Sequence, residues 1–239
     1  TNVAGGLMSM NGNMDLSADS ILVKGSVLSA ENGTLGITAD ELMVQASTDT
    51  TRHSNQMNMV SYSNELFNSS GVIDFIGTAT NQSDDGGSLS SNHNNSVLLG
   101  DQVVIKTKKT TLDGGNIKGG DVSVDTEELS IISRLDTHES EQKSEGYSAG
   151  MSVGYNKSES SSDSSWVNSV SGIEGRNSVK VKSEDTRLDG GYIANINEDG
   201  EMGDNLIIET DRLEVNDIVG TDTSDVNGYS VGVGLSSGS

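Results

Sequence analysis

The chain has 239 residues, and its composition excludes several classes of protein. With 14 basic against 36 acidic residues, the net charge is −22, so nucleic acid is excluded as a partner because its phosphates would be repelled. Cysteine is absent, which removes disulfides and thiolate zinc sites, and we expect no cofactor. Aromatic residues make up only 3% and proline is absent, which favours a thin core of Val, Ile and Leu in segments that pair along a continuous sheet.

Short alternating apolar runs fill the first regular block, residues 14–50. Leu16 and Leu35 lie 19 residues apart, and so do Val23 and Leu42. A spacing of about 20 is what one coil of a parallel β-helix requires. Helices are disfavoured because Asn, Ser, Thr, Gly and Asp are frequent and no helical stripe persists. An antiparallel sandwich is the alternative architecture, and the repeat favours the β-helix over it.

Three copies of one unit are indicated by longer repeats. Leu42 and Leu129 lie 87 positions apart, and the run TTLDGGNI from Thr110 returns as TRLDGGYI from Thr186 after 76 positions. We therefore predict a single β-helical repeat domain over residues 1–239, part of a longer chain. Its repeat blocks are expected at about 14–50, 96–137 and 178–223, and its extensions at 51–95, 138–177 and 224–239.

The extensions are the main functional candidates. We expect residues 51–95 to form a projecting hairpin or a mobile loop, with 83–95 the more mobile part. Larger side chains alternate with Ser and Gly over residues 146–155 and again after residue 228, so that one strand would carry the larger ones on one face. This pattern is typical of a membrane β-strand or of a strand that pairs on another sheet, and the alternative is a hairpin packed on the flank of its own solenoid. The candidate membrane or partner contacts are Tyr147, Met151, Val153, Tyr155, Tyr229, Val231 and Val233.

Candidate chemical sites have simpler structural explanations. Asp113-Gly114-Gly115 and Asp189-Gly190-Gly191 contain the residue types of calcium sites, but the nonapeptide calcium pattern is missing, so we interpret both as turns in which glycine adopts a positive φ. His53, His93 and His138 are interpreted as exposed loop residues and not as metal ligands. No nucleophile elbow is expected, because that strand-to-helix turn needs a helix and helices are disfavoured here, so we predict that the chain is not an enzyme. A carbohydrate-active β-helix is a remote alternative, and it would need two or three carboxylates converging on one flank.

One run carries a resemblance to a known family. GSVLSAENGTLGITADELMVQASTDT, residues 25–50, is followed by a Ser-rich tract and a G-Y-S-x-G-x-x-x-G segment, and this order resembles the haemagglutinin repeats of two-partner-secretion exoproteins. These include filamentous haemagglutinin and contact-dependent growth inhibition proteins of the CdiA type. The resemblance covers residues 16–235. It implies a right-handed parallel β-helix, export through an outer-membrane partner, and residence on a Gram-negative cell surface.

The expectation for the whole chain follows from the repeats and the resemblance together. We expect an all-β protein, a right-handed parallel β-helix with hairpin or loop extensions, that acts as a non-catalytic structural or interaction segment of a secreted exoprotein. The resemblance implies that it assists toxin delivery at the outer membrane of a target cell. The alternative is an adhesin filament segment that binds host or neighbouring cells. Its partners would be the outer-membrane secretion partner and either a target outer membrane or a surface receptor.

Overall fold

The computed structural model describes residues 5–69, 72–150 and 152–234. Every element within these ranges is a β-strand, so the expectation of an all-β chain is confirmed. No helix able to cross a membrane occurs in the described ranges. The chain divides into two compact units, and each unit is made of three separate segments of the sequence. Unit 1 comprises Thr1–Asp49, Ser91–Asp136 and Trp166–Gly220, and unit 2 comprises Thr50–Ser90, Thr137–Ser165 and Thr221–Ser239.

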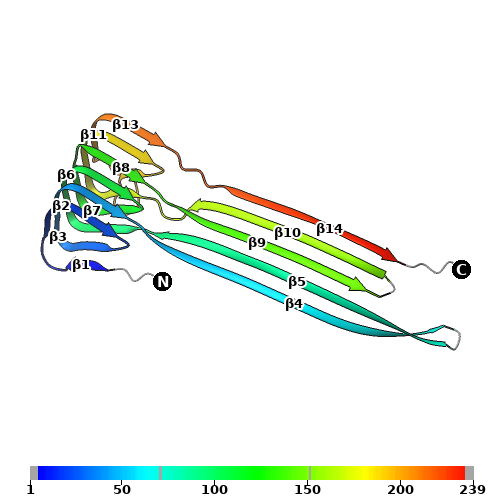
Figure 1. The fold of residues 1–239 in the computed structure, drawn as a ribbon. Helices are drawn as coiled ribbons and strands as arrows, with labels where there is room; N and C mark the ends of the chain where they lie inside the picture. The colour runs from blue at the N-terminus through cyan, green and yellow to red at the C-terminus, as the bar shows by residue number, and fades with distance from the viewer. Residues whose placement is uncertain (1–4, 70–71, 151, 235–239) are drawn as a thin grey trace. The chain divides into compact units, whose positions relative to one another are not determined.

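Unit 1 contains a nine-stranded sheet whose described strand pairs are all parallel. Figure 1 shows these strands stacked beside one another. Strands of this sheet come from distant parts of the sequence, and yet each pairs in a definite register. They are β1 (Gly6–Ser9), β2 (Met14–Lys24), β3 (Val27–Gln45), β6 (Ser96–Asp113), β7 (Gly115–Asp125), β8 (Glu128–Ile132), β11 (Gly172–Asp189), β12 (Tyr192–Asn195) and β13 (Leu206–Asn216).

The offset between paired residues stays near 20 in most pairs where no extension intervenes, and it rises to 27 for β11 with β13. It is 19 residues for β6 with β7 and β8, 20 for β11 with β12, and 21 for β3 with β1 and β2. The spacing predicted for the first block was therefore wrong by two residues, because Leu16 pairs with Ile37 and not with Leu35. The cause is a register shift between Ala30 and Thr34, where β3 has two more residues than its partner β6. A shift of two residues keeps the same face of the strand inward, so the alternating pattern survives.

Aliphatic side chains stack in ladders through the paired strands of unit 1. One ladder consists of Ile37, Ile105, Val124 and Val181, each at most 1% exposed. A second ladder, also aliphatic and buried, consists of Leu28, Leu98, Ile117 and Ile173. Burial of one such side chain contributes about 1.5–3 kcal/mol, so the ladders stabilise the parallel stack. The predicted core of stacked Val, Ile and Leu is confirmed.

The long sequence repeats correspond to one further ladder. Leu42, Thr110, Leu129 and Thr186 are paired in succession, which accounts for the recurrences after 87 and 76 positions. Thr110 is buried, and its hydroxyl lies 2.6 Å from that of Thr107. The buried hydroxyls in this ladder therefore have partners, as buried polar groups require.

Two glycine turns occupy equivalent positions in this stack. Gly114 has a φ of +71° and Gly190 a φ of +61°, in the left-handed region that favours glycine. The amide of Gly114 donates to the carbonyl of Ile132 at 2.9 Å, and the amide of Gly190 donates to that of Asn216 at 2.8 Å. The interpretation of both Asp-Gly-Gly runs as turns is confirmed.

Unit 2 is built on a five-stranded sheet to which all three predicted extensions contribute. Its strands follow the order β14-β10-β9-β5-β4, and Figure 1 shows them as long neighbouring strands. The expectation of mobility in residues 83–95 was wrong, because residues 83–94 belong to β5 and pair within this sheet. The elements are β4 (Ser47–Ser69), β5 (Val72–Asn94), β9 (Leu135–Ala149), β10 (Ser152–Val167) and β14 (Asp222–Gly234).

Candidate functional site

Antiparallel pairing sorts the side chains of unit 2 onto two different faces. Tyr155 on β10 lies directly opposite Val231 on β14, and Val153 lies opposite Val233. Residues directly opposite in an antiparallel pair point to the same side, so these four share what we call the tyrosine face. The intervening residues, such as the opposed pair Gly154 and Gly232, belong to the other face. The large side chains of this end of the sheet are thus gathered on one side.

Three tyrosine rings connect β9, β10 and β14 on this face. The ring centroids of Tyr147 and Tyr155 are 4.8 Å apart, and those of Tyr155 and Tyr229 are 5.7 Å apart. Tilted aromatic pairs at such distances contribute about 0.5–1.5 kcal/mol beyond their burial. A hydrogen bond with Tyr229, reinforced by partial burial, raises the pKa of the Tyr155 hydroxyl above its usual range. The hydroxyl of Tyr155, at the centre of the cluster, therefore keeps its proton at ordinary pH.

The segment predicted as one strand over residues 146–155 is instead the end of a hairpin. β9 ends at Ala149 and β10 begins at Ser152, so the single-strand expectation was wrong. The chain reverses at Gly150, whose amide donates to the carbonyl of Ser152 at 3.0 Å. Tyr147 and Tyr155 still share a face because they are brought opposite one another across the hairpin. Met151 lies outside the described residues.

The other six predicted contact residues are brought together on the tyrosine face. We call this group the contact patch, defined as Tyr147, Val153, Tyr155, Tyr229, Val231 and Val233. Its valines are 61–70% exposed, and Tyr147 and Tyr229 are 56% and 58% exposed. Exposed apolar side chains that cluster in this way are typical of interaction surfaces. None of the six carries a charge at neutral pH.

Two residues of β4 were not singled out from the sequence. The hydroxyl of Ser61 on β4 contacts that of Thr80 on β5 at 2.5 Å, so these two residues share a face of the sheet. Thr80 and Asp84 are four residues apart in β5 and therefore share that face as well. Asp84 accepts a hydrogen bond from Ser144 of β9, which places Ser144 on the same face. Ser144 and Tyr147 are three residues apart in β9, so their side chains lie on opposite faces of the sheet. Ser61 is therefore on the face away from the tyrosines, and its neighbours Val60 and Tyr62 lie on the tyrosine face. Both are exposed, Tyr62 by 79%. The only signal in the sequence was a short alternation, too weak to separate them from the polar tract around them.

Ion pairs border the contact patch on the same face. The Lys157 ammonium lies 2.9 Å from Glu159 and 3.8 Å from Glu145. The hydrogen bond to Glu159 raises the pKa of Lys157, and the same bond lowers the pKa of Glu159. One ammonium next to two carboxylates leaves a net charge of −1 beside the tyrosine cluster.

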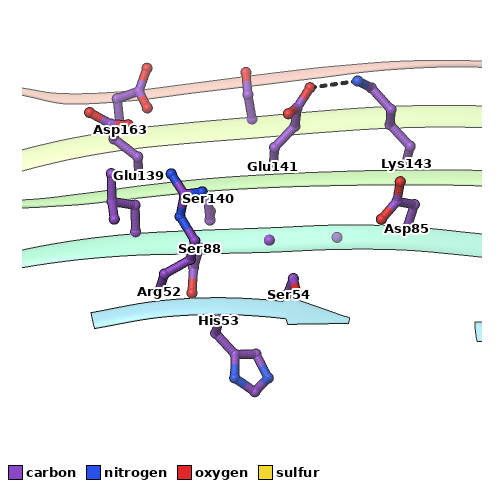
Figure 2. Close-up of a pocket in the computed structure, with 14 residues that line it drawn as sticks. Arg52, His53, Ser54, Asp85, Ser88, Glu139, Ser140, Glu141, Lys143 and Asp163 are labelled. Atoms are coloured by element: carbon purple, nitrogen blue, oxygen red, sulfur yellow. Dashed lines mark ion pairs between the residues drawn. The ribbon is translucent and has the colours of Figure 1, made fainter. Parts of the chain in front are cut away.

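A shallow cavity of about 520 Å³ lies elsewhere in unit 2 and is lined by charged side chains. Figure 2 shows Arg52, Lys143 and several carboxylates around it, with His53 pointing away from them. Glu141 and Lys143 form an ion pair at 2.7 Å. The cavity brings together the carboxylates of Asp85, Glu139, Glu141 and Asp163, all of which are exposed.

These carboxylates are the convergence that a carbohydrate-active enzyme would require. Glycosidases, however, need a general acid whose pKa is raised by an enclosed environment. Each carboxylate of the cavity is open to solvent, and Glu141 is paired with a lysine. The arrangement is that of a solvated ion network, which offers no enclosed acid and base pair.

The histidines lie in strands, so their placement in loops was wrong. His93 in β5 donates its backbone amide to Asp136 at 2.6 Å, and its ring nitrogen lies 3.2 Å from the same carboxylate oxygen. Asp136 is 2% exposed, so this contact provides partners for a buried carboxylate. His138 lies in β9, and its ring is 2.7 Å from the Ser90 hydroxyl. Only His53, in β4, is fully open to solvent among the three.

The carboxylates of the two glycine turns bond to protein groups. Asp113 pairs with Arg134, and Asp189 pairs with Arg187 at 2.8 Å. A hydrogen bond from Asn216, together with Arg187, lowers the pKa of Asp189. In the described part of the chain, no group of three or more His, Asp or Glu side chains is placed to hold a metal ion.

Comparison with known proteins gives one match. A family model described as Hemagglutinin repeat matches residues 1–147, which is more than half of the 239 residues. The match runs from the start of unit 1 through the first tyrosine of the contact patch. Searches of curated proteins and of solved structures gave no significant match.

Proposed function

The chain belongs to the hemagglutinin repeat family, as the resemblance in its sequence predicted, and on that premise we propose that it is a structural and interaction segment of a filamentous-haemagglutinin-like exoprotein. The family is of a structural, adhesin type and is not enzymatic. Proteins of this family are typically secreted to the surface of Gram-negative bacteria and need an outer-membrane partner. We propose the same export, partner and location for this chain.

Unit 1 is proposed to wind as a right-handed parallel β-helix that serves as the stalk. Offsets near 20 residues and continuous aliphatic ladders support this winding, since stacked coils bring equivalent side chains into register. The segments of unit 1 end at Asp49, Asp136 and Gly220, close to the block ends expected from the sequence. These ends support the proposal of one repeat domain with extensions, although the third segment begins at Trp166 and not at residue 178.

The contact patch is proposed to touch the outer membrane of a target cell, and this contact is proposed to assist toxin delivery in contact-dependent growth inhibition. The observation that carries the proposal is the collection of exposed Tyr and Val side chains from three strands on one face. Tyrosine suits a membrane interface because its ring is apolar and its hydroxyl remains wet. A chain with net charge −22 is repelled by anionic headgroups, so an uncharged patch is the part of unit 2 best able to approach them.

Vesicle flotation tests this contact with a matched pair of valines on one strand. Val231 and Val226 both lie in β14 and are 61% and 74% exposed, but they lie opposite Tyr155 and Ser160 respectively and so point to different faces. We expect Val231→Ser to reduce the fraction of chain bound to vesicles of phospholipid and lipopolysaccharide about 5-fold, since about 1 kcal/mol of apolar burial is lost. Val226→Ser should leave binding unchanged.

Two outcomes would contradict the proposal. Equal losses for the two variants would show that the tyrosine face is not the contact surface. Binding to native outer-membrane vesicles, but not to protein-free vesicles, would instead favour the adhesin alternative, in which the same patch binds a surface receptor.

A further inference from the structure

The outer side of β14 is an unprotected sheet edge. β14 pairs only with β10 among the described strands, and all its residues are exposed. Edge strands are usually blunted by lysine, proline or a bulge. β14 contains no Lys, Arg or Pro, and its two acids, Asp222 and Asp225, stand at one end. Residues 226–234 therefore present uncharged, unpaired backbone to solvent.

The internal repeat shows what kind of strand would complete this edge. Gly146-Tyr147-Ser148 in β9 recurs as Gly228-Tyr229-Ser230 in β14, so β14 is the counterpart of β9. β9 lies between β5 and β10, whereas β14 has a neighbour on one side only. We call the two strands of an extension its first and second arms, so β4 and β9 are first arms, β5 and β10 are second arms, and β14 is the first arm of the third extension. In the sheet order β4-β5-β9-β10-β14, first and second arms alternate. The missing neighbour of β14 would therefore be a second arm, and it would pair with β14 as β10 pairs with β9.

Side-chain contacts define the register that such a strand would adopt. In the β9–β10 hairpin, the Tyr147 ring contacts the Tyr155 ring, and Gly146 is buried where the Asn156 side chain packs over it. The counterpart Gly228 is exposed, and its nearest neighbours all come from β10. A new partner would thus place an aromatic residue opposite Tyr229 and cover Gly228 as Asn156 covers Gly146.

We propose that the outer edge of β14 accepts an antiparallel strand of the β10 pattern, donated by a further hemagglutinin repeat, with its tyrosine opposite Tyr229. A second copy of this chain is a poorer occupant. Its two sheet edges, β4 and β14, are both first arms, so neither edge offers the other a β10-like strand. This strand addition does not depend on membrane contact, and its test uses no membrane.

Disulfide trapping tests both the binding and the register. The chain contains no cysteine, so an introduced thiol is unique. The probe is a synthetic peptide with the sequence of residues 152–167 that carries cysteine in place of Gly154. Gly154 faces Ser148 in the hairpin, with the Ser148 hydroxyl 2.8 Å from the position a Gly154 Cβ would take, so its expected partner on β14 is Ser230. Ser224→Cys is the matched off-register control, because Ser224 lies on the same face of the same strand.

We expect the Ser230→Cys chain to trap the peptide at least 10-fold faster than the Ser224→Cys chain, and a scrambled peptide to be trapped by neither. Equal trapping at both positions, or none in a chain whose circular dichroism shows intact β-structure, would overturn the proposal. Faster formation of a Ser230→Cys homodimer than of the peptide adduct would also overturn it, because a second copy would then be the preferred occupant of the edge.

Discussion

Replacing Ile105 by alanine tests the continuous core of unit 1. Ile105 is fully buried and lies between Ile37 and Val124 in one ladder. The change removes three carbons, at about 0.8 kcal/mol for each, and leaves a cavity, so the free energy of unfolding should fall by about 3–4 kcal/mol. Ile208 provides the matched control, since it belongs to the same ladder through Val181 but is 37% exposed. Ile208→Ala should cost roughly 1 kcal/mol.

Urea unfolding followed by far-ultraviolet circular dichroism measures both changes. The Ile105→Ala midpoint should fall well below that of Ile208→Ala, while both proteins keep native strand content in buffer. Equal losses of stability would refute the reasoning, because they would mean that β6 is no more enclosed than the last strand of the sheet.

Two further predictions concern pH and backbone conformation. Burial, and then a hydrogen bond of 3.0 Å to Glu174, raise the pKa of Tyr192 to about 12. The folded state therefore holds this proton more tightly than the unfolded state, and stability falls as pH rises from about 10 to 12. Urea titrations at pH 9 and 11.5 measure this fall in the free energy of unfolding. The fall should be larger in the wild type than in Tyr192→Phe by on the order of 1 kcal/mol, after solvent screening is allowed for. Gly114→Ala should cost about 3 kcal/mol of stability, because a positive φ is combined with overlap of the new methyl group on Ala46. Gly200→Ala is the control and should cost about 1 kcal/mol, because Gly200 has a φ of +80° but open space around it. Similar thermal midpoints for the two variants would show that the turn at Gly114 relaxes freely.

The parallel core was predictable because it repeats a local pattern. Strict alternation identifies the inward face, and recurrence after 76 and 87 positions identifies residues that share a ladder, such as Leu42 and Leu129. The register of the first block could not be obtained in this way. Two extra residues between Ala30 and Thr34 leave the alternation unchanged, so no local pattern reports their presence.

The contact patch was predictable in membership but not in geometry. Tyr147 and Tyr155 have the same strand parity, and the hairpin brings them opposite each other, so one long strand and a hairpin produce the same alternating pattern. The pairing of the three extensions into one sheet depends on contacts between distant parts of the chain. The hydrogen bond from His93 to the buried carboxylate of Asp136 is of the same kind, since it joins residues 43 positions apart.

Membrane contact by the tyrosine face is tested most directly by a fluorescent reporter on β14. The absence of native cysteine allows an environment-sensitive dye to be attached to Val231→Cys or, as the control, to Val226→Cys. On addition of vesicles that contain lipopolysaccharide, the dye at position 231 should shift its emission to shorter wavelength, and the dye at position 226 should not. An equal response at both positions, or no response at position 231, would contradict the proposed contact.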